Sequence, residues 1–155
     1  MVATITDPNY TGAASGTLVI GTVSLDPWRA SQFTAGQIAA GQAADNADPD
    51  GDGFTNYDEY VMGINPQSAT PQPLAITPTS NNKISLTFFA RSATGGGYAG
   101  LTRKYDLQQC TDLAESDSWQ PVAGHTNIVG AGQTVIITLP GGAPTLFYRL
   151  KVRLE

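Results

Sequence analysis

The amino-acid sequence predicts a mainly β protein, built around a small antiparallel β-sandwich of about six strands. Apolar and polar side chains alternate in several short runs after residue 73, which is the pattern of strands with one buried face. Only 14% of the residues are charged, while Gly (17) and Pro (10) are plentiful, as expected for short strands joined by turns. The length of 155 residues and the hydrophobic fraction of 41% suffice for one domain with a modest core, or for two small ones.

Residues 1–25 contain two short β segments around a turn. β-branched residues fill 2–6, turn-forming residues fill 7–12, and the strand pattern resumes at 16–20. The run ATITDPNYTGAASGTLVI resembles the end of the MBG-type immunoglobulin-like repeats of large bacterial surface proteins. The resemblance implies that residues 1–25 are the tail of such a repeat and that other domains lie upstream in a longer protein.

Residues 26–47 are predicted to form a connector with weak helical character. Trp28 and Phe33 are its apolar anchors, and Thr34 is a suitable cap for a short helix reaching Ala44. Gly36 and Gly41 weaken this helix, since each costs roughly 1 kcal/mol relative to Ala in a helix interior.

A firmer helix is predicted over residues 56–62. Gly63 stands where a left-handed C-terminal cap belongs, and Pro66 prevents continuation. The apolar residues of this segment are spaced to line one face, so we expect that face to be packed: Phe54, Tyr57, Val61 and Ile64.

The predicted strands follow residue 73. Gly-rich segments at 95–97 and 130–132 are expected to be loops, the first of them flexible, and no internal repeat is visible. The six strand segments are 74–77, 84–90, 104–108, 119–122, 134–139 and 146–153.

Residues 48–59 match the calcium loop of an EF-hand, Asp-x-Asp/Asn-x-Asp/Asn-Gly-x5-Glu, at every constrained position. Gly53 would allow the sharp turn that wraps the chain around the ion. Ca²⁺ takes six to eight oxygen ligands, whereas Mg²⁺ demands a tighter octahedron and keeps its waters. The predicted Ca²⁺ ligands are the carboxylates of Asp48, Asp50 and Asp52, the main-chain carbonyl of Phe54, Asn56 directly or through water, and Glu59 with both oxygens.

An alternative interpretation is an acidic surface turn before a helix whose capping pair is Asn56 and Glu59. It does not account for three alternating aspartates around two glycines, whose carboxylates repel one another without a cation. Because there is one loop and the segment before it is Gly- and Ala-rich, we expect a structural ion rather than a sensor with paired hands. The loop also concentrates the acidity: residues 1–60 carry eight acidic side chains and one basic one.

A wider resemblance covers about residues 27–153. The segments DPWRASQF, AADNADPDGDGFTNYDEYVMGINPQ, YDLQQCTDLAESDSWQPV and FYRLKV resemble the C-terminal modules of large exported proteins of planctomycete- and verrucomicrobia-like bacteria. In those proteins an acidic loop of thrombospondin-type-3 or dockerin type precedes a terminal β domain. The resemblance implies a non-catalytic, extracellular or cell-surface module for display, spacing or attachment. Asn65 replaces the Asp usual in that family, and a single loop does not support the cohesin binding of dockerins.

The domain organisation that follows is a repeat tail at 1–25, a connector with the calcium loop and short helix at 26–72, and a β-sandwich at 73–153. Residues 154–155 are expected to be vector-derived, like Met1.

No catalytic apparatus is predicted. His125 is the sole histidine and Cys110 the sole cysteine, so neither a zinc cluster nor an internal disulfide is possible. A Cys110–His125 dyad stays open, although an inert, half-buried thiol is the simpler interpretation. The remaining carboxylates available for acid–base chemistry mostly fall in one turn and give no tuned pair: Asp106, Asp112, Glu115 and Asp117.

Carbohydrate binding is the main alternative function, because exposed aromatic rings on β modules pack against sugar C–H surfaces. Tyr98, beside the triple glycine, is the candidate most expected to be exposed; the others are Trp28, Phe89, Trp119 and Phe147. The partners expected are a polysaccharide or another cell-surface component. Nucleic acid is not expected, since no basic patch is interleaved with aromatics, and no apolar run is long enough to span a membrane.

Overall fold

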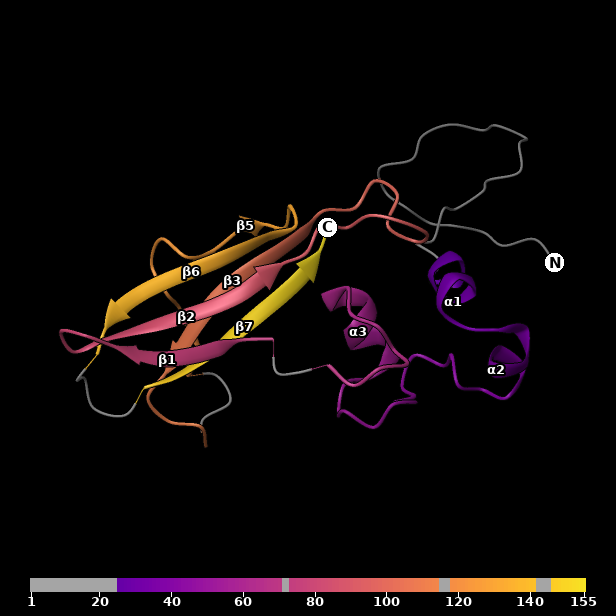
Figure 1. Ribbon diagram of the computed structural model, residues 1–155, viewed down its shortest axis with the longest axis horizontal. Helices are drawn as coiled ribbons and strands as arrows, with labels where there is room; N and C mark the ends of the chain where they lie inside the picture. The colour runs from indigo at the N-terminus through magenta and orange to yellow at the C-terminus, as the bar shows by residue number, and fades with distance from the viewer. Residues whose placement is uncertain (1–24, 71–72, 115–117, 142–145) are drawn as a thin grey trace, which may run out of the picture.

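The computed structural model describes residues 25–70, 73–114, 118–141 and 146–155. The β segments predicted in residues 1–24 lie outside this part of the chain. Figure 1 shows the strands gathered at one end of the molecule and the helices at the other, with α3 beside the end of β7.

The described strands form two antiparallel sheets, which confirms the predicted fold class. One sheet has the order β1 (Ala75–Thr79), β2 (Lys83–Ala90), β6 (Gln133–Pro140). In the other, β3 (Arg103–Cys110) pairs along its whole length with β7 (Phe147–Leu154). The opposite edge of β3 pairs with two short strands, β4 (Gln120–Pro121) and β5 (Ile128–Val129).

These seven strands within the described residues include one that the sequence did not predict, β5. Two residues are too few to show an alternating pattern, so β5 exists only because the chain runs beside Lys104 and Tyr105 of β3.

The sandwich core contains the apolar members of the predicted alternation. Leu86, Phe88 and Ala90 of β2 are buried against residues of the facing sheet, which include Tyr105 and Leu107. The alternate positions of the same sheet point to solvent, and Ile136 is 66% exposed. The strands therefore have one buried face, as the period-two pattern predicted.

The N-terminal part contains three short helices, α1 (Asp26–Gln32), α2 (Ala35–Ala39) and α3 (Asn56–Met62). Thr34 caps α2 as predicted, through a capping box with Gln37. The helix ends at Ala39 rather than at Ala44, because Gly41 adopts a left-handed φ of 80°. No helix among these is long and apolar enough to cross a membrane, a statement limited to the described residues.

A second apolar cluster joins the helices to the sandwich. Trp28 and Phe33 are buried in it, as predicted for anchors, together with Tyr60 of α3. The Tyr60 ring meets Trp28 edge to face at 5.5 Å and stacks on Tyr98 with ring centroids 4.8 Å apart. Crossed hydrogen bonds fix this pair, since Tyr60 Oη donates to the carbonyl of Gly97 (2.7 Å) and Tyr98 Oη to that of Tyr60 (2.8 Å).

The expectation of a flexible glycine loop bearing an exposed Tyr98 is therefore wrong. Tyr98 is only 7% exposed. Gly97 has a φ of 87° and lies so close to α1 that a Cβ there would sit 2.8 Å from Cβ of Trp28. The glycines let the backbone approach Trp28, and this close packing buries the tyrosine beside them.

Arg103 of β3 ties the C-terminal end of α3 to the sandwich. Its side chain is 1% exposed and donates to the carbonyls of Val61 (2.6 Å), Ser92 (2.6 Å) and Tyr60 (3.2 Å), with its guanidinium 4.9 Å from the centre of the Tyr98 ring. A cation at the last turn of a helix is favoured by the helix dipole. Gly63 is the predicted left-handed cap, with φ 72°, and a Cβ there would lie 2.6 Å from Nη1 of Arg103.

Candidate metal centre

Residues 48–55 fold into a tight loop before α3, and the last residues of the predicted calcium motif, 56–59, form the first turn of that helix. Both carboxylate oxygens of Asp48 accept backbone hydrogen bonds, from Gly51 N at 2.8 Å and from Gly53 N at 3.0 Å. Gly51 and Gly53 have φ values of 74° and 93°, the left-handed conformation that glycine adopts most easily. The sharp turn predicted at Gly53 is thus present.

The turn gathers three carboxylates. One ligand oxygen from each of Asp48, Asp50 and Asp52 lies within 4.8 Å of the others. Asp50 and Asp52 also accept bonds from the backbone two residues on, at 3.2 Å and 2.9 Å, which fixes their side chains. Like charges this close disfavour one another unless a cation neutralises them.

The first turn of α3 is capped by residues other than those the alternative interpretation needs. Thr55 Oγ1 accepts from Asp58 N at 3.2 Å, and Asp58 Oδ2 accepts from Thr55 N at 3.1 Å, which completes a capping box. Asn56 and Glu59 are therefore not the capping pair. Thr55 and Asp58 were missed at the sequence level, although Thr-x-x-Asp before an apolar run resembles a capping-box signal.

Asn56 has its amide orientation fixed by the connector. Its Nδ2 donates to the carbonyls of Gln42 (2.8 Å) and Ala44 (2.7 Å), and the residue is 1% exposed. With both N–H groups used on that side, Oδ1 is buried and has no hydrogen-bond partner among the described residues.

Glu59 is the most unusual group in the site. It is 0% exposed, and neither Oε1 nor Oε2 has a hydrogen-bond partner in the described part of the chain. Asp50 Oδ2 is also buried and has no hydrogen-bond partner among the described residues. Buried polar atoms are normally paired, so four orphan acceptors in one loop require an explanation.

The electrostatics place Glu59 against the three aspartates. Burial raises its pKa, and the negative charges of Asp50, Asp52 and Asp48 raise it further, to about 7. The three aspartate carboxylates thus form one close group, and the Glu59 carboxylate, outside that group, is still near enough for their charges to act on it. Such a donor set suits a hard cation.

The remaining predicted ligand, Phe54, precedes the cap of α3, and its N–H donates to Asp52 Oδ1. Its side chain lines a groove with Tyr57 and Val61. Tyr57 is 52% exposed, so the packed face predicted from Phe54, Tyr57, Val61 and Ile64 is wrong in that member. The buried face of α3 is instead made of Asn56, Glu59 and Tyr60, because the loop and the aromatic cluster both lie on that side.

The segment after α3 returns to the loop. Thr70 N donates to Asp52 Oδ2 at 2.8 Å, a contact for which the sequence gives no signal. Asn65 Oδ1 accepts from Gln67 N at 3.0 Å and serves this local turn.

Outside the loop, the predicted candidates for chemistry are dispersed. Cys110 is a free, buried thiol, more covered than predicted. The His125 carbonyl accepts a hydrogen bond from Leu107 N of β3. Leu107 lies three residues before Cys110 on the same strand, so the backbones of His125 and Cys110 are about 10 Å apart. Burial acts to raise the pKa of Asp106, but hydrogen bonds from Asn127 N and the Arg153 guanidinium outweigh it and lower that pKa. Asp112 accepts from Ala114 N in a turn, and Glu115 and Asp117 lie outside the described residues.

The raised pKa of Glu59 predicts an unusual pH dependence for metal-free protein. A carboxyl whose pKa is higher in the folded state (about 7) than in the unfolded state contributes stability that is complete below about 4.5 and is lost as pH rises through about 7. In chelator, the melting temperature should therefore fall between pH 5 and pH 8, whereas the lowered pKa of Asp106 acts only at more acidic pH. Thermal melts across this range check the sign; a flat or rising profile would contradict the placement of Glu59.

Comparison with known proteins found a match for one segment of the chain. Residues 1–24 match the MBG domain family. No curated protein and no solved structure matches the chain. The matched residues lie outside the described part, where the sequence predicted them to end a repeat. This segment is therefore similar to part of an MBG domain.

Proposed function

We propose that this chain is a non-catalytic extracellular module of a larger exported bacterial protein, and that a Ca²⁺ ion in residues 48–59 stabilises it. The single observation that carries the proposal is the set of buried oxygens on Asp50, Asn56 and Glu59 that have no hydrogen-bond partner among the described residues. All three are positions that supply a ligand, directly or through water, in EF-hand loops.

Calcium is the cation that this donor set fits best. It would be held by carboxylates of Asp48, Asp50, Asp52 and Glu59, by Asn56 Oδ1 directly or through water, and by the Phe54 carbonyl. A bidentate Glu59 would use the two oxygens that no N–H or O–H group of the described residues reaches. Mg²⁺ is disfavoured because it prefers a smaller octahedron with several retained waters.

The surroundings favour a stabilising role over a signalling one. Asn56 is bonded to the connector and Asp52 to Thr70, so one ion would fix three segments of the chain at once. The C-terminal end of α3 is held to the sandwich by Arg103, which leaves little freedom for the opening that sensor hands undergo.

The place of the module in a larger exported protein is supported by the MBG-like tail at residues 1–24. It is also supported by the resemblance of residues 27–153 to C-terminal modules of planctomycete- and verrucomicrobia-like exported proteins. A display, spacing or attachment role follows from that setting. Extracellular calcium is the appropriate supply for a single loop of this type, since extracellular modules bind it at about 10⁻⁴ to 10⁻³ M.

Thermal melts in chelator, Ca²⁺ and Mg²⁺ test the proposal. A ligand at about 100 times its Kd adds about 2.7 kcal/mol, which corresponds to a rise in Tm of roughly 5–10 °C for a chain of this size. We expect this rise with Ca²⁺ and a much smaller one with Mg²⁺ at equal concentration. Equal melting temperatures in chelator and in about 100 mM Ca²⁺, which is 100 times a Kd of about 10⁻³ M, would rule out a stabilising calcium.

A further inference from the structure

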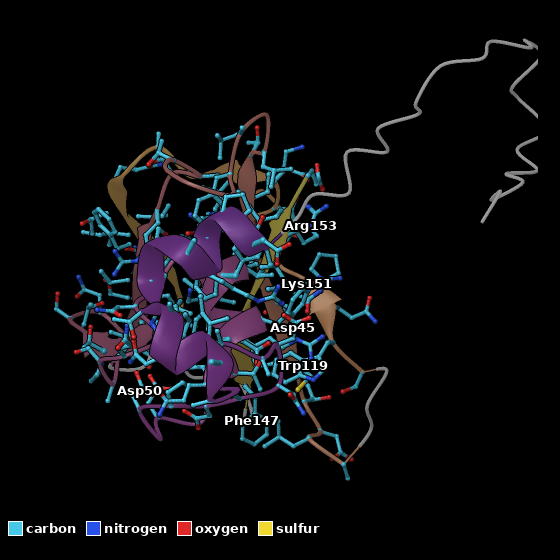
Figure 2. All side chains as sticks on the ribbon, turned by 90° about the vertical axis from the view of Figure 1, so that its right-hand side faces the viewer. Asp45, Asp50, Trp119, Phe147, Lys151 and Arg153 are labelled. Carbon is cyan, nitrogen blue, oxygen red and sulfur yellow. The ribbon has the colours of Figure 1, made fainter. Side chains whose placement is uncertain are left out.

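The solvent-facing side of the β3–β7 sheet carries half of the basic residues of the chain. Alternate residues of β3 and β7 share a face, and the register pairs Lys104 with Arg153 and Asp106 with Lys151. We name as the basic face the four cations that this register collects from the eight in the sequence: Lys104, Arg149, Lys151 and Arg153. Figure 2 shows Lys151 and Arg153 on one side of the molecule and Asp50 of the acidic loop on the other.

Two aromatic rings lie at one end of this face. Phe147 pairs with Cys110 across β3, and Trp119 immediately precedes β4 on the other edge of the same strand. Cys110 is only 3% exposed although it points to the outer side, as expected if these larger neighbours cover it. Trp119 and Phe147 remain partly exposed, unlike Trp28 and Tyr98.

The cation nearest to these rings is held in place. The Arg149 guanidinium lies 4.4 Å from the centre of the Trp119 ring, and its Nε donates to Gln108 Oε1 at 2.7 Å. A guanidinium fixed by a ring and a side-chain amide loses little freedom when it binds an anion.

The charges on the basic face are not equally available. Arg153 is paired with Asp106 at 3.0 Å, and Lys104 with Glu155 at 2.7 Å. The described residues place no carboxylate within ion-pair distance of Arg149 or Lys151, and Lys151 is exposed. Two available cations therefore stand about 6.8 Å apart along β7, next to two aromatic rings.

From this arrangement we propose that the basic face binds an acidic polysaccharide, with sugar rings on Trp119 and Phe147 and sugar carboxylates on Arg149 and Lys151. The face is an open sheet surface, which suits an extended polymer. Aromatic ring faces suit the C–H surfaces of sugars, and a guanidinium suits a carboxylate. The inference goes beyond the proposed calcium role and uses none of the loop residues.

The number of available cations favours this ligand over nucleic acid. The affinity of a protein for nucleic acid depends on neutralising many phosphates. Two available cations on a protein of net charge −5 can neutralise few of them.

The test is a calorimetric titration of the whole chain with oligogalacturonate, in Ca²⁺ buffer at low and at moderate salt. Dextran serves as the neutral polysaccharide and oligo-dT as the competing polyanion. We expect oligogalacturonate to bind more tightly than either, with an affinity that falls as salt rises.

Lys151→Glu and Trp119→Ala test where the polysaccharide binds, and Lys83→Glu is the matched control. Lys151→Glu should weaken oligogalacturonate binding about five- to tenfold, as expected for reversing one surface charge. Lys83→Glu, the same change at an exposed lysine of β2 in the other sheet, should leave it unchanged. Trp119→Ala should weaken binding at all salt concentrations; Lys151→Glu tests the site if that variant proves unstable.

An equal loss of affinity for oligogalacturonate in Lys151→Glu and Lys83→Glu would overturn the proposal, because binding would then depend on the total charge of the protein and not on the basic face. Tighter binding of oligo-dT would overturn it in favour of a nucleic acid surface. Absence of binding to oligogalacturonate at low salt would refute it directly.

Discussion

Glu59→Gln is expected to remove the calcium-dependent rise in melting temperature while raising the stability of the metal-free protein at pH 8. The first effect follows because a neutral amide cannot supply the bidentate carboxylate that completes the coordination sphere. The second follows because Glu59 is fully buried, has no hydrogen-bond partner in the described part of the chain, and is repelled by Asp50, Asp52 and Asp48. Its charge therefore destabilises the fold without metal. Thermal melts of both proteins in chelator and in Ca²⁺ give both numbers.

The matched control for Glu59→Gln is Asp45→Asn. Asp45 is an acidic residue of the connector close in sequence to the loop, but it pairs with Arg29 and is not a predicted ligand. This variant should keep the full calcium shift. If Glu59→Gln also keeps it, or if it lowers stability in chelator, then Glu59 serves the fold by contacts that need no ion.

Arg103→Met is expected to lower the free energy of unfolding by about 3 kcal/mol or more. Methionine fills similar volume but leaves the carbonyls of Val61 and Ser92 without the Arg103 donor, and each such loss costs about 1–3 kcal/mol. The Tyr60 carbonyl keeps its hydrogen bond from Tyr98 Oη. The midpoint of urea unfolding in saturating Ca²⁺ measures the change. Lys83→Met, the removal of an exposed cation, should change it by no more than about 0.5 kcal/mol.

Comparable midpoints for Arg103→Met and Lys83→Met would show that the guanidinium does not hold α3 to the sandwich. A selective loss of stability in Arg103→Met would identify Arg103 as the link between the candidate metal centre and the β domain. Through this link a change in the stability of residues 48–59 would affect the stability of the sandwich, because Tyr60 follows Glu59 directly and its ring stacks on Tyr98.

Features encoded by local periodicity were predictable from sequence. The strand faces followed because a one-residue slip would expose Leu86, Phe88 and Ile137, which are all buried. The α3 boundaries and the left-handed Gly63 followed from the loop motif and a C-terminal glycine. The gathering of Asp48, Asp50 and Asp52 followed likewise, since alternate residues around Gly53 fold back on one another.

Features that depend on contacts between distant segments were not predictable. Tyr98 was expected to be exposed because triple glycine usually marks a mobile loop, but here Gly97 allows close packing on Trp28, 69 residues earlier. The burial of Arg103 could not be predicted, because arginine on a strand is usually exposed. It is buried here because α3 packs against it. The basic face likewise depends on the pairing of β3 with β7.

The assignment of Asn56 shows the same limit within the site. The sequence favoured metal binding over helix capping for this residue. Only the structure shows that Thr55 and Asp58 complete the cap, and that Gln42 and Ala44 fix the amide of Asn56.

Isothermal titration of the chelator-treated protein with CaCl₂ tests the central claim most directly. One Ca²⁺ per chain is expected, with a Kd of about 10⁻⁴ to 10⁻³ M as in other extracellular modules, and no heat for Glu59→Gln under the same conditions. Absence of binding at millimolar Ca²⁺ would contradict it, and so would equal binding by Glu59→Gln.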